Sequence, residues 1–309
     1  MVDSPNRYAY RVGIEISSKS LTAVVLDDGD AVEKSVSVAV SEGEDIIAQL
    51  AGIVAELKSE FNGLERIGVA MPGLVDRKSG RVAFSAIIPK QSDVDFAKLI
   101  IEATNLNVVL ENDANAAAYG EYCCGAGRGS DNLFYATLGT GIGGAFILGG
   151  EIWHGASGFA GEFGYVPINS EGMKLEEVAS SENIVRRTRS RFHQDSTSSL
   201  GKLTEEDLTL EDIITAAQNK DDFAQMMLQR TGLYVGSAVA TVINLLNIER
   251  IVVGGAIMQA KHLVLDAIIA RARELSFAPS FDSTRIVAGE LGANAAAIGA
   301  AFISGEISD

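Results

Sequence analysis

Residues 108–119 read VVLENDANAAAY, and residues 133–150 read LFYATLGTGIGGAFILGG. The first stretch is an apolar strand that leads Asn112 and Asp113 onto a helix of small residues, and the second is a strand, a glycine-rich turn over 139–144 and another strand over 145–148. Glycine lets backbone N–H groups approach a phosphate closely, because no side chain intervenes. A carboxylate at a strand end is suited to accept a hydroxyl proton during phosphoryl transfer. Together the two features indicate chemistry on a phosphate.

Each feature also has a plainer interpretation. A glycine-rich turn often only closes a β-hairpin. Asp113 before an alanine-rich run is compatible with an ordinary helix N-cap. Glu162, between two glycines, is compatible with an ordinary loop carboxylate. From spacing alone these alternatives stay open.

Length and charge narrow the class of protein. A chain of 309 residues predicts two domains, and 47% apolar with 21% charged residues is typical of a globular protein. The net charge of −16 argues against nucleic acid or an anionic membrane as partner, because both would repel such a surface. It does not argue against a small anionic substrate.

The cysteine content and the length of the apolar runs indicate the cellular compartment. Cys123 and Cys124 are adjacent in a helix-like run, so no disulfide is expected between them. There is no other cysteine, which excludes a thiolate zinc cage and favours a reducing compartment. No signal-peptide core or run of transmembrane length is present. We therefore expect a cytoplasmic protein.

Hydrophobic periodicity predicts an α/β chain. Strands are expected over 12–16, 21–26, 31–40, 67–71, 107–110, 133–138, 145–148, 250–253 and 285–288. Helices are expected over 45–61, 95–104, 175–191, 210–218, 223–247, 261–275 and 293–303, with another from about 116. The strand–turn–strand pattern of 12–29 recurs at 133–150, which predicts two similar domains around a ligand cleft. Chance recurrence of hairpins is the alternative.

Several segments together resemble the ROK group of sugar kinases and related repressors, within the actin-like ATPase superfamily. They are residues 110–118, 138–144, 155–164, 252–255 and 291–301. Each is unspecific alone, but their order over nearly the whole chain is specific. The resemblance implies an α/β fold of two actin-like ATPase (ribonuclease H-like) domains facing each other across a cleft. The smaller would hold 1–111 plus the C-terminal helix 293–309, and the larger 112–292.

The resemblance also implies roles for individual residues. Asp113 would be the base that deprotonates a sugar hydroxyl, and Asn112 would hold neighbouring hydroxyls. Gly73, Glu162 and Glu176 would line or contact the sugar. ATP would lie against the remaining matched positions, namely Glu15, Lys19, Gly139, Thr140, Gly141, Gly143, Gly144, Gly254 and Gly255. Of these, the 139–144 turn would cradle phosphates and Gly254-Gly255 would flank the adenosine.

The sequence departs from the family pattern in the first phosphate loop. Where family kinases have an aspartate followed by Gly-Gly-Thr, this chain reads Glu15-Ile16-Ser17-Ser18-Lys19. Loss of two glycines hinders backbone approach to the γ-phosphate. Glu15 is still expected to hold Mg²⁺ through water, since a carboxylate is retained. Lys19 either replaces backbone donors with a charge or blocks the site.

Two further departures concern zinc and the sugar. Tyr165 stands where the family has a zinc-binding histidine, and the cysteine cluster that should follow is missing. We therefore expect no structural zinc. The asparagine expected in the region 85–89 is also absent, which removes one hydrogen bond to the sugar.

The function implied is an ATP-dependent hexose kinase of glucokinase type, requiring ATP and Mg²⁺. A sugar- or metabolite-binding protein that has lost kinase activity is the alternative, and the altered first loop favours it. A repressor is not expected, because little chain precedes the strand at Val12 and the charge is acidic. The implied partners are a sugar, ATP and a second copy of the chain in a homodimer, with no nucleic acid and no membrane.

Overall fold

The computed structural model describes residues 10–41, 45–77, 79–84, 94–191, 197–204 and 206–305. The chain divides into two compact units. Unit 1 comprises Met1–Gly129, Glu151–Ala160 and Ala293–Asp309, and unit 2 comprises Ser130–Gly150 and Gly161–Gly292. This division differs from the expected boundary after residue 111, because the helix that begins at Asp113 and the segment 151–160 both fall in unit 1.

Unit 1 is built on a five-stranded sheet with the order β3-β2-β1-β4-β8. Its strands are β1 (Tyr10–Ile16), β2 (Ser20–Asp27), β3 (Val32–Ala39), β4 (Arg66–Met71) and β8 (Asn107–Asn112). The expected antiparallel meander of the first three strands is confirmed. β4 pairs parallel with β1, and β8 pairs parallel with β4. The carboxyl ends of β1, β4 and β8 therefore lie at one edge of the sheet.

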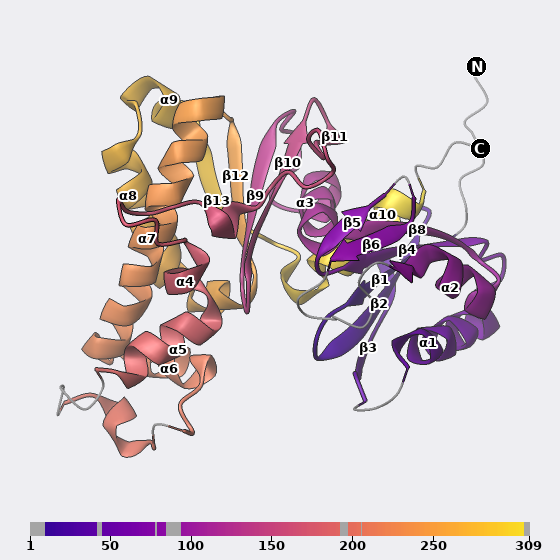
Figure 1. Ribbon diagram of the computed structural model, residues 1–309, viewed down its shortest axis with the longest axis horizontal. Helices are drawn as coiled ribbons and strands as arrows, with labels where there is room; N and C mark the ends of the chain where they lie inside the picture. The colour runs from indigo at the N-terminus through magenta and orange to yellow at the C-terminus, as the bar shows by residue number, and fades with distance from the viewer. Residues whose placement is uncertain are drawn as a thin grey trace. The chain divides into compact units, whose positions relative to one another are not determined.

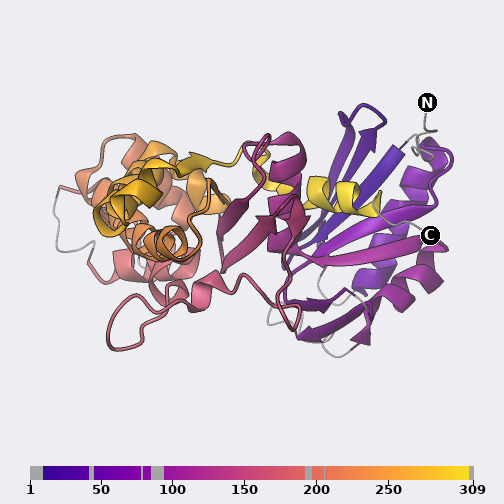
Figure 2. The ribbon, with the colours of Figure 1, turned by 90° about the horizontal axis from the view of Figure 1, so that it is seen from above.

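Helices cover both faces of this sheet (Figure 1). α1 (Ile46–Glu60) and α2 (Phe96–Thr104) share an apolar core with the sheet, in which Ile14, Leu50 and Phe96 are fully buried. α10 (Ala295–Ser304), yellow in Figure 2, lies along the opposite face and packs against α3 (Asp113–Cys124). The sheet face toward α10 presents glycine. A Cβ at Gly13 or Gly68 would lie 2.0 or 1.9 Å from a carbonyl oxygen of α10.

A second, three-stranded sheet of unit 1 was not expected from the sequence. It consists of β5 (Leu74–Asp76), β6 (Arg81–Phe84) and β7 (Val94–Asp95), in that order. Strands this short contain too few residues for a period of two to stand out. The region 85–89, where an asparagine was expected, lies outside the described residues.

Unit 2 repeats the topology of unit 1. Its sheet belongs to a five-stranded order β11-β10-β9-β12-β13, in which the two-residue edge strand β11 comes from the segment Glu151–Ala160 that is counted with unit 1. The strands are β9 (Leu133–Leu138), β10 (Ile142–Leu148), β11 (Glu151–Ile152), β12 (Arg250–Gly254) and β13 (Arg285–Ala288). β9 and β10 are antiparallel, β12 is parallel to β9, and β13 is parallel to β12. The predicted internal repeat is therefore confirmed, and chance recurrence of hairpins is not its explanation.

The helices of unit 2 surround an apolar core that includes Phe134 and Ile268. They are α4 (Glu176–Ala179), α5 (Ser181–Arg189), α6 (Leu210–Gln218), α7 (Asp222–Leu246), α8 (His262–Leu275) and α9 (Ala278–Asp282), with 3-10 turns at Phe163–Tyr165, Ser199–Lys202, Ala256–Ala260 and Gly292–Asn294. α7 and α8 lie side by side (Figure 1). Glycines permit this approach, since a Cβ at Gly232 or Gly236 would lie 2.6 Å from a backbone oxygen of α8.

Two helical segments of unit 2 differ from the sequence-based expectation. The helix expected over 175–191 is interrupted at Ser180, whose ψ of 158° is extended. The short helix α9 was not expected. Arg187 of α5 packs into the unit: it donates to Thr231 Oγ1 at 2.7 Å and lies 5.5 Å from the ring centre of Tyr234. Burial lowers the pKa of Arg187 to about 10.

The described residues contain no helix that is both long enough and apolar enough to span a membrane.

Candidate active site

The candidate catalytic residues of unit 1 lie at the carboxyl edge of its sheet. The register pairs Glu15 of β1 with Ala70 of β4, and Met71 of β4 with Asn112 of β8. Gly73 and Asp113 follow directly beyond these strand ends. Polar residues after neighbouring parallel strands converge at such an edge. Unit 1 therefore brings together Glu15, Gly73, Asn112 and Asp113.

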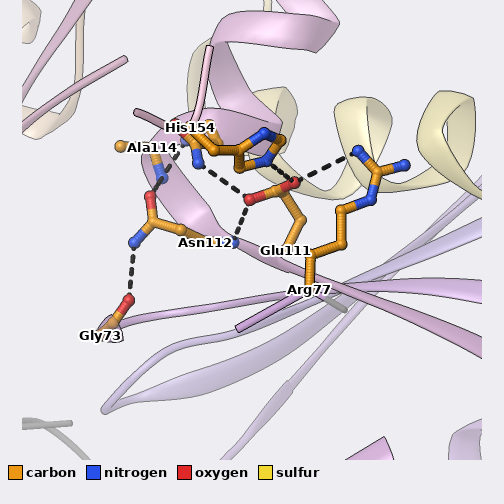
Figure 3. Close-up of polar contacts among 7 residues, drawn as sticks. Gly73, Arg77, Glu111, Asn112, Ala114 and His154 are labelled. Atoms are coloured by element: carbon orange, nitrogen blue, oxygen red, sulfur yellow. Dashed lines mark hydrogen bonds and ion pairs between the residues drawn. The ribbon is translucent and has the colours of Figure 1, made fainter. Parts of the chain in front are cut away.

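Asn112, rather than Asp113, is the N-cap of α3. Asn112 Oδ1 accepts from the N–H groups of Ala114 at 2.9 Å and Asn115 at 3.1 Å. Asn112 Nδ2 donates to the carbonyl oxygen of Gly73 at 3.0 Å (Figure 3). Gly73 has φ of +112°, in the region that side-chain-bearing residues rarely occupy. The cap interpretation of Asp113 is thus wrong, because the capping bonds belong to its neighbour.

Asp113 is the first residue of α3, and its carboxylate is only partly occupied. Asp113 Oδ1 accepts from the N–H of Ala114 at 2.9 Å. Burial raises the pKa of Asp113, against the lowering effect of nearby N–H groups and the Asn112 side chain. A raised pKa makes a carboxylate a better proton acceptor when it is ionised.

The carboxylates of Glu15 and Asp113 lie close enough to repel each other when both are ionised. Burial, with repulsion from Asp113 second, raises the pKa of Glu15 to about 7. A divalent cation would relieve this repulsion, and oxygen ligands are those that Mg²⁺ prefers. Among the described residues no cluster of three or more His, Cys, Asp or Glu side chains is arranged around a common metal position. Two carboxylates are a donor set that suits a Mg²⁺ whose other ligands are water and substrate phosphates.

We expect Glu15→Gln to stabilise the protein increasingly as the pH rises from about 4.5 to about 7, and by a constant amount above that. A carboxyl whose folded pKa is raised from 4.5 to about 7 binds more protons when folded. Its stabilising contribution is complete below about pH 4.5 and is lost as the pH rises through about 7. The loss is at most about 3 kcal/mol, and glutamine does not suffer it. Thermal melting without Mg²⁺ should give equal Tm values near pH 4.5 and a higher Tm for the variant at pH 8. A difference that does not change with pH would contradict the environment described for Glu15.

The turn between β1 and β2 uses its own backbone donors. Ser17 N–H donates to the oxygen of Ser20 at 2.9 Å. Ser17 Oγ accepts from the N–H groups of Lys19 at 3.3 Å and Ser20 at 3.0 Å. Within the described chain, the N–H of Ser18 is the one donor of this turn left without a partner. The turn therefore has few unpaired backbone N–H groups that could donate to a phosphate, whereas the exposed side chain of Lys19 remains available.

If Lys19 contacts the ATP phosphates, as the sequence predicts, Lys19→Ala should raise the KM for ATP about three- to tenfold through loss of its positive charge. Steady-state kinetics at saturating sugar measures this. Lys98→Ala is the control, since Lys98 is an exposed lysine of α2 paired with Glu102 at 3.9 Å. An unchanged KM for ATP in Lys19→Ala would place Lys19 outside the phosphate site.

In unit 2 the glycine-rich turn is shorter than expected. Gly143 and Gly144 belong to β10, paired with Thr137 and Ala136 of β9, so the turn covers only 139–141. Gly139 N–H donates to the oxygen of Gly141 at 3.0 Å. Among the described residues, the N–H groups of Thr140 and Gly141 have no protein partner. These two exposed donors are the part of the turn that suits a phosphate.

Glu176 braces this turn. Its Oε2 accepts from the N–H of Ile142 at 2.8 Å. Ser181 N–H donates to the oxygen of Gly139 at 2.8 Å, so α4 bonds the end of the turn and α5 bonds its start. Glu162 lies in the same unit, exposed, at the start of the 3-10 turn Phe163–Tyr165.

Other glycines predicted to contact ATP have clear packing roles. A Cβ at Gly144 would lie 2.9 Å from the rings of Phe134 and the Cβ of Phe163. A Cβ at Gly254 would lie 2.2 Å from the hydroxyl of Tyr135. Gly255 has φ of +91°, and its Cβ would lie 2.4 Å from the oxygen of Leu138. Gly254 and Gly255 thus bring the end of β12 against the end of β9.

Tyr165, expected from the sequence to replace the family's zinc-binding histidine, is 61% exposed. Lys174 Nζ lies 3.9 Å from the centre of its ring. The segment between them folds back on itself, with Ile168 N–H donating to the oxygen of Met173 at 2.8 Å and Leu175 N–H donating to the oxygen of Val166 at 3.0 Å. This hairpin leads directly into α4 and Glu176.

One group of residues at the β8–α3 junction was missed by the sequence analysis. The buried residues Glu111 and Asn115 form a polar cluster with the partly buried Arg77 and His154. Figure 3 shows Glu111 between His154, Arg77 and Asn112. The available signal was Glu111 itself, a carboxylate inside an apolar strand, since a buried charge is costly unless it is paired. The partners come from distant segments and carry no local signal.

Known proteins with similar sequences show the family of this chain. Residues 11–306 match the ROK family. The chain is 31% identical to a glucokinase of Thermotoga maritima over 94% of this chain and 96% of the relative. It is 27% identical to the xylose repressor of Bacillus subtilis over 95% of this chain and 76% of the repressor.

A crystal structure of a ROK family glucokinase from Streptomyces griseus, in complex with glucose and AMPPNP, is similar with a TM-score of 0.85. The two chains share 28% identity, over 96% of this chain and 99% of the glucokinase. The expected two-domain α/β fold of the actin-like ATPases is confirmed by this likeness. This chain therefore belongs to the ROK family.

Proposed function

We propose that the protein transfers the γ-phosphoryl group of ATP to a hexose hydroxyl, as a glucokinase-like enzyme. The observation that carries the proposal is Asp113, a partly exposed carboxylate of raised pKa at the carboxyl edge of the sheet in unit 1. The likeness to glucokinases supports it. Because the chain is also similar to a xylose repressor, the proposal is tested by measuring kinase activity.

In this proposal Asp113 accepts the proton of the attacking hydroxyl, which makes the oxygen a better nucleophile. Asn112 and Gly73 bind neighbouring hydroxyls. Asn112 Oδ1 accepts from two N–H groups of α3 and one hydrogen of Asn112 Nδ2 is donated to Gly73, which leaves the second hydrogen of Nδ2 for the sugar. Glu162 also binds the sugar. Glu176 does so through Oε1, since Oε2 accepts from Ile142.

We assign the nucleotide to the donor groups that have no protein partner in the β1–β2 turn and in the 139–141 turn. Thr140 and Gly141 donate backbone N–H groups to phosphate, while Lys19 adds a positive charge and Gly254-Gly255 flank the adenosine. Gly139, Gly143 and Gly144 shape this turn and its strand rather than contacting phosphate. Glu15 holds Mg²⁺ through water, and the ion neutralises charge on the phosphates during transfer. We also propose a cytoplasmic homodimer that needs no zinc and binds no nucleic acid or membrane.

A second candidate is a sugar-binding protein without kinase activity. The closed Ser17–Ser20 turn favours it, because a phosphate loop with occupied backbone donors holds a γ-phosphate less well.

One experiment separates the two candidates. The protein is incubated with ATP, Mg²⁺ and a panel of hexoses, ADP release is followed, and binding of each hexose is measured by calorimetry. A kinase releases ADP only with the hexose that it binds. Measurable hexose binding without ADP release would replace the kinase with the sugar-binding protein.

A further inference from the structure

Glu111, the residue before Asn112, is the centre of the polar cluster that it forms with Asn115, Arg77 and His154. Glu111 is 2% exposed and lies at the end of β8. A carboxylate in such surroundings loses several kcal/mol of hydration, which must be offset by hydrogen bonds or opposite charges. Both of its oxygens are in fact occupied, and they are occupied by different kinds of partner.

The first oxygen fixes the strand–helix junction. Glu111 Oε1 accepts from the backbone N–H of Asn112 at 2.9 Å and from Asn115 Nδ2 at 2.9 Å (Figure 3). Asn115 lies in the first turn of α3, and its side chain is buried. One oxygen atom thus joins the last residue of β8 to the first turn of α3, on either side of Asp113.

The second oxygen binds two segments that are distant in sequence. His154 Nε2 lies 2.9 Å from Glu111 Oε2, and since a carboxylate only accepts, the imidazole donates. Arg77 Nη1 lies 3.7 Å from the same oxygen. Arg77 follows β5, and His154 belongs to Glu151–Ala160, the segment of unit 1 inserted between two parts of unit 2. The cationic arginine and the imidazole donor offset the buried charge.

We infer that Glu111, held by His154 and Arg77, is a positioning residue that fixes Asn112 and Asp113 for the reaction. The inference rests on the proposed function for its kinetic consequence, but its structural content is independent of it. Without the His154 bond, Glu111 Oε2 lacks its nearest donor, and the carboxylate gains by turning toward water. Oε1 then leaves Asn112 and Asn115, and the start of α3 loosens. Glu111 has no exposed oxygen with which to act on a substrate itself.

The test compares two replacements of His154 in the full-length protein. Leucine fills a similar volume without a donor, and glutamine places an N–H near the position of Nε2. We expect His154→Leu to lower kcat about tenfold, the scale of losing an outer hydrogen-bond partner of a site residue, with the KM for ATP changed less than about twofold. His154→Gln should restore kcat to within about threefold of the wild type.

A second measurement does not depend on catalysis. Hydrogen–deuterium exchange followed by mass spectrometry reports the amides of 112–118 in both variants and in the wild type. His154→Leu should speed exchange in this peptide but not in α1, and His154→Gln should restore protection. If the wild type has no kinase activity, the proposed function fails, and this measurement alone decides the inference.

Two results would overturn the inference. One is unchanged exchange over 112–118 in His154→Leu. The other is an equal rise in exchange in α1 and α3 with a lowered Tm, because that would reduce His154 to a general contributor to stability. Glu111→Gln gives a check from the other side: its amide nitrogen meets the donors of His154 and Arg77, so it should loosen 112–118 as His154→Leu does.

Discussion

Asp113→Asn should lower kcat by about a hundredfold or more, the usual scale for losing a positioned general base. The amide cannot accept the proton of the sugar hydroxyl at neutral pH. The geometry should persist, because an amide oxygen can accept from Ala114 N–H as Oδ1 does now, at 2.9 Å. A coupled assay of ADP formation at saturating ATP and sugar measures kcat, and calorimetry shows whether the variant still binds the sugar.

Asp222→Asn is the matched control for this change. Asp222 is the first residue of α7, behind the N-cap Asp221, just as Asp113 is the first residue of α3 behind Asn112. Both substitutions remove one carboxylate from the first turn of a helix, so their effects on the helix dipole are similar. We expect full activity in Asp222→Asn. Retention of more than about a third of kcat in Asp113→Asn would refute the assignment of the base.

Gly299→Ala should be strongly destabilising. A Cβ at Gly299 would lie 1.7 Å from the carbonyl oxygen of Ala116, which no real contact allows, so α10 and α3 must separate. Overpacking of a buried contact costs typically about 1–3 kcal/mol, and a backbone partner cannot rotate away, so we expect about 3 kcal/mol or more. The Tm should fall by roughly 6 °C or more, as measured by calorimetry.

Gly52→Ala controls for the change of glycine to alanine. Gly52 lies exposed in α1, and nothing lies within 4 Å of a Cβ built there. Alanine is the better helix former by about 0.5–1 kcal/mol, so this variant should match or exceed the wild-type Tm. Equal stability of Gly299→Ala and the wild type would show that α10 does not pack backbone to backbone against α3.

The sequence predicted most of the regular structure, because the elements are long and periodic. The meander of β1 to β3 recurs in β9 to β11, and apolar alternation with Asp-Gly and Gly-Gly turns marks both copies. The placement of Asn112 and Asp113 at a strand end followed from the same pattern. The boundaries of α6 and β13 were predicted to the residue.

What the sequence did not predict depends on contacts between distant residues. From the sequence, the segment Ser17–Ser20 showed only the loss of two glycines. The hydrogen bonds that the Ser17 hydroxyl accepts from Lys19 and Ser20 could not be foreseen. Gly144 and Gly254 were assigned to a ligand, and the sequence did not reveal that each also packs closely against an aromatic side chain, Phe134 or Tyr135. The partners of Glu111 come from three separate segments, so no spacing rule could link them.

The central claim is that a phosphoryl group passes from ATP to a sugar hydroxyl. Its most direct test is the identification of the product by mass spectrometry, after incubation of the wild type and Asp113→Asn with ATP, Mg²⁺ and the hexose that binds most tightly. The account predicts a hexose monophosphate in equal amount to ADP in the wild type, and almost none in Asp113→Asn. Inorganic phosphate in place of hexose monophosphate, or a bound hexose that stays unmodified, would contradict it.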